Sequence, residues 1–217
     1  MMLKRTLSTL ILAPPFLAAI WFGYPYFNII IGILGVLSVA EVLLITNNKK
    51  GRKVSLIIIL GGFISGTYFI SFGDYELSLA SFLFGGIIVI FSSKKNVKNM
   101  LWLEFGYLYV VIACVSLIEL RNFSGIGLQA VIWLFAVVWA NDIGAYIIGR
   151  KFGTARITPK TSPGKTWIGT LAGIFFAAFV GWGVMAIFFK HESVFTLIYL
   201  SVIVAIVAQI GDYLESY

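Results

Sequence analysis

Charged residues are scarce in this sequence of 217 residues: only 12% are Asp, Glu, Lys or Arg, whereas 60% are hydrophobic. A soluble domain carries roughly 25% charged residues, and a globule of this length has too little interior to bury so much apolar sequence. The mean hydropathy is +0.98. These values exclude a soluble enzyme, a secreted scaffold and a disordered chain, and they predict an integral membrane protein.

Cysteine is almost absent, and so is any sign of a cleaved leader. The single cysteine, Cys114, lies within an apolar run, so no internal disulfide can form. The apolar stretch near the N-terminus lacks the small residues of a signal-peptide cleavage site, because it contains Pro14 and Pro15 and continues into Trp21 and Phe22. We therefore expect this stretch to be a first, kinked membrane span.

Long apolar runs make up most of the sequence. A helix needs ~20 predominantly apolar residues to cross the hydrocarbon core. Eight runs approach this length, and they predict an all-α, polytopic transmembrane bundle of about eight spans at residues 7–22, 26–45, 54–72, 77–92, 101–119, 126–149, 167–189 and 194–210. No linker or internal repeat divides the chain, so we expect one integral membrane domain, 1–217, with N-terminal spans in 1–125 and a catalytic-like region in 126–217.

Basic residues outnumber acidic ones by 16 to 9, and their placement predicts an orientation. With eight spans, all of the basic residues except Arg121 and Lys190 fall on the side of the N-terminus. The positive-inside rule then places both termini and the loop 150–166 in the cytoplasm. We expect the protein to lie in a bacterial inner membrane.

Acidic residues inside or beside apolar runs are costly in lipid, which makes them candidates for a functional site. Asp142 lies about 12 Å along a helix from Arg150, at 1.5 Å per residue, and Tyr146 and Arg150 share its helical face. Asp212 ends the last run on the same side, and Glu215 follows one turn later. Mg²⁺ commonly takes one or two carboxylates plus phosphates, so we expect a metal site here. A structural ion pair between Asp142 and a buried basic residue is the alternative.

The loop RKFGTARITPKTSPGKTW carries five basic residues and no acid. We expect its end to open span seven, with Ser162 as N-cap, Pro163 as first helical residue and Gly164–Thr166 as the opening turn. A helix N-terminus binds anions, and Lys165 adds a charge, so the pattern predicts a phosphate site. The GKT triplet is not a Walker A motif, because Pro159 stands where that motif needs glycine. A loop that only fixes topology and contacts anionic lipid is the alternative.

The chain resembles the membrane-bound phosphatidate cytidylyltransferases, also called CDP-diacylglycerol synthases, in three segments: NDIGAYIIGRKFG, ITPKTSPGKTWIGTLAG and QIGDYLES. That family carries Asp-x-Gly-Ala-Tyr-x-x-Gly-Arg, then Ser-Pro-Lys-Lys-Thr-Trp-Glu-Gly, then Gly-Asp-x-x-Glu-Ser. Order, spacing and membrane placement agree over residues 141–217. The resemblance implies a Mg²⁺-dependent transfer of CMP from CTP to phosphatidic acid, giving CDP-diacylglycerol and pyrophosphate.

The resemblance also assigns roles to matching positions. The expected catalytic residues are Asp142, Lys165 and Asp212. The expected metal ligands are Asp142, Asp212 and Glu215, which would hold Mg²⁺, with a second cation left open. The expected substrate-binding residues are Tyr146, Arg150, Lys160, Ser162, Lys165 and Thr166, with Trp167 in support. The implied partners are CTP, phosphatidic acid and membrane lipids, without nucleic acid, and a homo-oligomer stays open.

Some features depart from the family. The family has Lys at the position of Gly164 and Glu at that of Ile168, and it continues beyond Glu-Ser with a segment that supplies another metal-binding Asp, whereas this sequence stops at Tyr217. We therefore expect a truncated or split form that binds nucleotide weakly and transfers little CMP. A non-catalytic membrane partner with this fold and a CTP-dependent polyprenol kinase stay open. A transporter is less supported, because no inverted repeat is visible.

Overall fold

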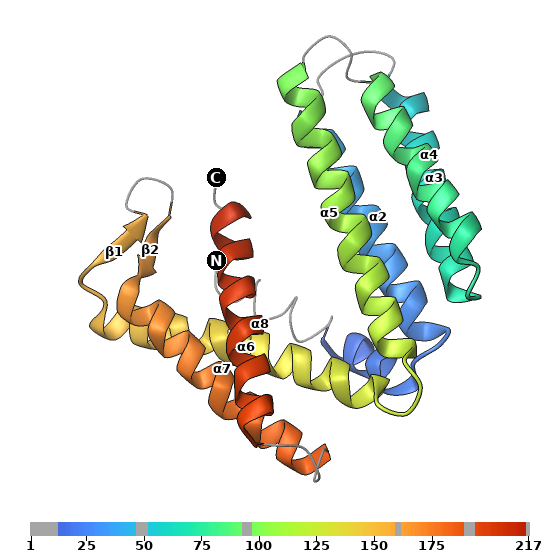
Figure 1. The fold of residues 1–217 in the computed structure, drawn as a ribbon. Helices are drawn as coiled ribbons and strands as arrows, with labels where there is room; N and C mark the ends of the chain where they lie inside the picture. The colour runs from blue at the N-terminus through green and yellow to red at the C-terminus, as the bar shows by residue number, and fades with distance from the viewer. Residues whose placement is uncertain (1–12, 47–51, 93–96, 159–161, 189–193, 216–217) are drawn as a thin grey trace. The chain divides into compact units, whose positions relative to one another are not determined.

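The computed structural model describes residues 13–46, 52–92, 97–158, 162–188 and 194–215. These residues form eight helices and one two-stranded hairpin, so the predicted all-α fold is confirmed with the hairpin as an addition (Figure 1). The helices are Ala13–Phe22, α2 (Tyr26–Thr46), α3 (Arg52–Ser71), α4 (Tyr75–Ser92), α5 (Val97–Asn122), α6 (Gly127–Phe152), α7 (Trp167–Phe188) and α8 (Val194–Glu215). Each coincides with a predicted apolar run, although the start of the first run lies outside the described residues.

Four helices are long and apolar enough to cross a membrane by length and composition: α2, α5, α6 and α7. The first helix, α3, α4 and α8 contain shorter apolar stretches within the described residues. The protein is therefore an integral membrane protein, and the count of eight spans stays a prediction. The chain forms two compact units, Met1–Leu128 and Gln129–Tyr217, which are described separately below.

In the first unit, α3 packs along α4, and α2 packs against α5 and α3 (Figure 1). Phe63 and Phe82 meet edge to face in the core, with ring centroids 5.7 Å apart. Tyr107 is buried and its hydroxyl donates to the carbonyl of Phe82 at 3.0 Å. A Cβ on Gly62 would lie 3.0 Å from the carbonyl oxygen of Ser81. Gly62 therefore serves close packing, because only a residue without a side chain lets α3 and α4 approach so closely.

In the second unit, α7 packs along α8, and buried side chains of α6, α7 and α8 meet in one core. Its fully buried members are Val137, Ala177 and Ala205. Beside them the indole nitrogen of Trp133 donates to the hydroxyl of Ser201 at 3.2 Å. The small side chains let the helix backbones approach closely. Such packing holds membrane helices together, because lipid is as apolar as they are and provides no hydrophobic driving force for their association.

The segment between α6 and α7 folds differently from the prediction. Strand β1 (Arg156–Thr158) pairs antiparallel with strand β2 (Ser162–Thr166), with Arg156 opposite Thr166. The prediction that Ser162 caps span seven, with Pro163 to Thr166 as its first turn, is therefore wrong. The physical reason is that the backbone of this segment pairs with β1 as an extended strand, which excludes helical hydrogen bonds.

Candidate functional site

Helix α7 begins at Trp167 and is capped by Thr166, four residues later than predicted. The Thr166 hydroxyl oxygen accepts a hydrogen bond from the Gly169 amide at 3.2 Å, the usual arrangement of an N-cap. The Trp167 amide donates to the Ala155 carbonyl at 3.1 Å. Two amides of the first turn are therefore bonded within the protein, so the predicted cradle of free amides at Ser162–Thr166 is not formed.

Lys165 lies on β2 and reaches helix α8. Its ammonium forms an ion pair with the Asp212 carboxylate at 2.8 Å, donates to the Asp212 backbone carbonyl, and lies 4.6 Å from the centre of the Tyr213 ring. The Lys165 side chain is 18% exposed and that of Asp212 is 64% exposed. The hairpin thus holds a half-buried cation against the end of α8, where its carboxylate partner is open to the surroundings.

Asp142 on α6 completes this group of charges. It interacts electrostatically with both Asp212 and Lys165, although the three residues lie on three different elements. One carboxylate oxygen of Asp142 accepts a hydrogen bond from the Asn141 side-chain amide at 3.2 Å. The structure therefore brings together the three residues that the sequence analysis named as catalytic candidates.

A polar network beneath these charges was missed by the sequence analysis. Asn141 is 2% exposed, and its side-chain carbonyl accepts from the Gln209 amide at 2.8 Å. The same Gln209 nitrogen donates to the Thr170 carbonyl at 3.0 Å. The Thr170 and Tyr213 hydroxyls share a hydrogen bond of 2.9 Å. A signal was present, because Gln209 is the one amide in the last apolar run and shares a helix face with Asp212 and Tyr213.

Glycines let the helices of this unit meet below the charges. A Cβ on Gly169 would lie 2.8 Å from the Ala145 carbonyl oxygen and 3.0 Å from the Gly149 Cα. A Cβ on Gly173 would lie 2.7 Å from the side-chain oxygen of Asn141. Gly169 and Gly173 thus serve close helix packing, and Gly173 also leaves space for the network.

The other predicted site residues have different surroundings. Arg150 donates to the Tyr146 hydroxyl at 2.6 Å, and both side chains are exposed on α6. Ser162 is half-buried on β2, and Trp167 is exposed at the start of α7. Lys160 lies outside the described residues, as does the side chain of Glu215. Their predicted roles stay predictions.

The carboxylates of Asp142 and Asp212 can be compared with the ligands that a magnesium ion takes. Within the ranges that the structure describes, no group of three or more His, Cys, Asp or Glu residues could enclose a metal ion. Asp142 on α6 and Asp212 on α8 nevertheless lie close enough for their charges to repel. Because Mg²⁺ usually takes one or two carboxylates, water and substrate phosphates rather than a complete protein cage, two such carboxylates are an adequate donor set.

These features define the class of protein. It is a helical integral membrane protein in which two carboxylates and a lysine meet at one end of a unit, above a buried amide network. Residues 3–217 match the Cytidylyltransferase family, and the chain belongs to that family.

Similar proteins carry the name phosphatidate cytidylyltransferase. The one from Brucella suis is 33% identical over 65% of this chain and 51% of its own length. Those from Haemophilus influenzae and Bacillus subtilis are 28% and 26% identical, covering 100% and 99% of this chain and 85% and 83% of their own lengths. The chain spans about half the length of the Brucella protein. The resemblance predicted from the three sequence segments is thus confirmed.

Proposed function

We propose that this protein transfers CMP from CTP to phosphatidic acid, giving CDP-diacylglycerol and pyrophosphate. The observation that carries the proposal is the ion pair of Lys165 on β2 with Asp212 on α8, to which Asp142 on α6 is linked through Asn141 and Gln209, one turn before Asp212. A site for two polyanionic substrates needs positive charge and metal ligands together. Membership of the cytidylyltransferase family and the names of the relatives support the reaction class.

In this reaction a phosphate oxygen of phosphatidic acid attacks the α-phosphorus of CTP and forms a new P–O bond. The bond from the α-phosphorus to the oxygen that bridges to the β-phosphate breaks, and pyrophosphate leaves with the electron pair. The nucleophile is already an anion, so the protein has no covalent intermediate to form. Its task is to position the two phosphates and to neutralise the charge that develops on the leaving group.

Asp142 and Asp212 would hold the magnesium ion. When bound, the ion would supply Lewis-acid polarisation of the phosphates and charge neutralisation. Asn141 donates to Asp142 and so fixes the orientation of that carboxylate. The links from Asn141 through Gln209 to Thr170 then tie α6, α8 and α7 into one support.

Lys165 would move from carboxylate to phosphate. In the structure its ammonium pairs with Asp212 at 2.8 Å. A bound metal ion would compete for the same carboxylate, because a divalent cation attracts it more strongly than an ammonium does. Lys165 would then neutralise the pyrophosphate, while the hairpin keeps its side chain over the site.

The test is an assay of the purified chain in lipid nanodiscs with labelled CTP, phosphatidic acid and Mg²⁺. Asp142→Asn, Asp212→Asn and Lys165→Met should each lower kcat/KM for CMP transfer by about 10²-fold or more, since each removes a preorganised charge. Asp74→Asn, which removes an exposed carboxylate of the first unit, is the matched control and should have no effect. Mg²⁺-dependent binding of CTP is measured in parallel and should weaken in both aspartate variants.

Two results would contradict the proposal. One is CTP binding that is equally strong in the wild type and in both aspartate variants. The other is transfer of phosphate from CTP to a polyprenol by a protein that transfers no CMP to phosphatidic acid. Protein folding is checked by thermal unfolding, so that a lost signal is assigned to the site.

We also infer that both termini and the loop 150–166 face the cytoplasm of a bacterial cell. The support is the distribution of Lys and Arg in the sequence, together with CTP being a cytoplasmic nucleotide in this reaction. The charged cluster then opens toward the side from which its water-soluble substrate arrives.

A further inference from the structure

The first unit contains two adjoining cavities at the end where α3 passes into α4. One is a groove of about 530 Å³, lined mainly by apolar residues of α2 and α3, among them Ile29, Ile33, Val36, Leu37, Ile64 and Tyr68. The other is a polar pocket of about 670 Å³, lined by Tyr75, Glu119, Arg121, Asn122 and Ser124 among others. Tyr24 and Ser71 line both cavities. Both volumes lie within the range typical of ligand sites.

A buried acceptor without a donor lines the groove. Asn28 is 5% exposed, and its amide nitrogen donates to the Ser71 hydroxyl at 3.0 Å. Ser71 in turn donates to the Thr67 carbonyl at 2.7 Å, so the amide nitrogen of Asn28 must face Ser71. The side-chain oxygen of Asn28 then has no hydrogen-bond partner among the described residues. Such a buried oxygen is costly, and it places an unsatisfied polar atom beside the apolar groove.

The polar pocket offers one positive and one negative group that are not paired with each other. Arg121 donates to the carbonyls of Ile20 at 2.7 Å and Trp21 at 3.1 Å. These bonds use two of the five guanidinium N–H groups and hold the rest at the pocket. Glu119 accepts from the Tyr75 hydroxyl at 3.2 Å. Two charges of opposite sign, fixed apart, match a zwitterion better than a simple anion.

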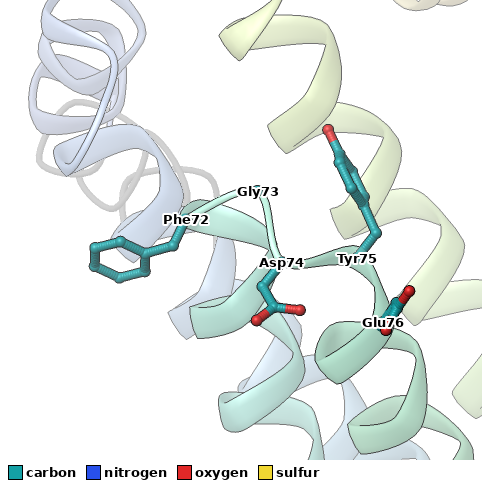
Figure 2. A pocket seen from close by; sticks show the side chains of 5 residues that line it. All are labelled: Phe72, Gly73, Asp74, Tyr75 and Glu76. Atoms are coloured by element: carbon teal, nitrogen blue, oxygen red, sulfur yellow. The ribbon is translucent and has the colours of Figure 1, made fainter.

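The turn between the two helices borders both cavities. Figure 2 shows Phe72 and Tyr75 pointing in different directions from this turn, beside a further cavity of about 510 Å³ that is lined by Phe72–Glu76. Phe72 meets the rings of Tyr24 and Tyr68, with centroids 6.2 Å and 4.9 Å away, and lines the groove. Tyr75 lines the polar pocket. Aromatic side chains of this kind gather at the membrane–water interface, where a lipid headgroup meets its acyl chains.

We propose that these cavities bind a phospholipid whose headgroup carries a primary ammonium. An acyl chain lies in the groove, the phosphate binds Arg121, and the ammonium binds Glu119. All lining residues belong to the first unit, so this lipid site is distinct from the cluster of Asp142, Lys165 and Asp212 and does not depend on the proposed reaction.

The test measures lipid retention by native mass spectrometry of the delipidated full chain. It receives equal amounts of phosphatidylethanolamine, phosphatidylcholine, phosphatidylglycerol and phosphatidic acid with identical acyl chains. Choline has no N–H donor, and phosphatidic acid has no positive group. Retention of phosphatidylethanolamine should exceed that of these two by about tenfold, which corresponds to about 1.4 kcal/mol. Equal retention of the ethanolamine and choline lipids, or of the ethanolamine and glycerol lipids, would overturn the proposal.

A charge variant tests the polar pocket. Glu119→Gln keeps an acceptor for Tyr75 but removes the negative charge, so the ethanolamine preference should fall about tenfold. Glu76→Gln removes a carboxylate at the same turn that lines neither the groove nor the polar pocket, and the preference should be unchanged. An unaltered preference in Glu119→Gln would refute the assignment of the ammonium.

A filling variant tests the groove. Gly32 lines the groove, and a Cβ there would make only ordinary contacts, at 3.6 Å or more from Thr67. Gly32→Leu should therefore fold, as judged by an unchanged melting temperature, yet retain every phospholipid at least tenfold less. Gly61→Leu places the same side chain on α3 at a position with nothing within 4 Å and should retain lipid as the wild type does. Full lipid retention in a folded Gly32→Leu protein would contradict the site. If Gly32→Leu does not fold, Gly32→Ala is measured in its place, and full lipid retention in that variant would contradict the site.

Discussion

The side-chain amide of Asn141 has two duties in the second unit. Its nitrogen donates to Asp142, and its oxygen accepts from Gln209. Because Asn141 is almost fully buried, neither group can turn to water when a partner is lost. The orientation of Asp142 on α6 therefore depends on Gln209 of α8. These hydrogen bonds connect the charged cluster to the buried amide network.

Replacing Gln209 tests this dependence. Gln209→Leu leaves the Asn141 oxygen buried without a donor, which should lower the free energy of unfolding by about 1–3 kcal/mol. Gln129→Leu removes an amide near the start of α6 that forms none of the bonds of the network, and it should change stability by less than about 0.5 kcal/mol. Denaturant titration in detergent measures both. A Gln209→Leu protein as stable as the wild type would show that the network contributes nothing to the fold.

At the scale of elements, helices α6 and α7 meet through glycine. Gly149 and Gly169 face each other where the two helices cross, and Thr166 closes the contact by capping α7. The cap also fixes the point where the hairpin ends and the helix begins. Since Lys165 directly precedes the cap, the position of its ammonium relative to α8 depends on this crossing.

A single methyl group should disturb the crossing. In Gly169→Ala the new Cβ would lie 2.8 Å from a backbone carbonyl that cannot rotate away, so the helices must separate, and the stability should fall by about 1–3 kcal/mol. Gly183→Ala, on the same helix with nothing within 4 Å, should be neutral or stabilising by up to about 1 kcal/mol, because alanine favours helix. Equal stability of the two variants would contradict the close contact. Thermal unfolding of the purified proteins decides between them.

At the scale of the whole molecule, the charge distribution predicts an orientation in the membrane. The loops that the positive-inside rule assigns to the cytoplasm hold nearly all Lys and Arg residues, and the turn between α3 and α4 holds Asp74 and Glu76 without a basic residue.

Labelling with an impermeant thiol reagent tests the orientation. The native Cys114 is buried, so a cysteine introduced at Thr158 or Asp74 gives the signal. In sealed cells Asp74→Cys should react from outside, and Thr158→Cys should react only after the membrane is opened. The reverse pattern, or reaction of both from outside, would refute the predicted topology.

The sequence predicted the helices well, because each apolar run is close to the length that crosses a bilayer and a membrane helix satisfies its own backbone. It also indicated Asp142, Lys165 and Asp212, since charges beside apolar runs are rare and costly. A local sequence pattern therefore predicts an element whose backbone hydrogen bonds are local, as they are in helices α2 through α8.

Only the tertiary structure decided the features whose partners are distant in sequence. Ser162 and Pro163 read as a helix start, but pairing with residues 156–158 makes the segment a strand, because strand hydrogen bonds come from another part of the chain. Gln209 looked like one polar residue among apolar ones until α8 placed it against Asn141, 68 positions away. The sequence by itself determined which segments enter the membrane and which charges are unusual there. The meeting of α6, β2 and α8 determined which of those charges act together, because electrostatic and hydrogen-bond energies depend on distance in space and not along the chain.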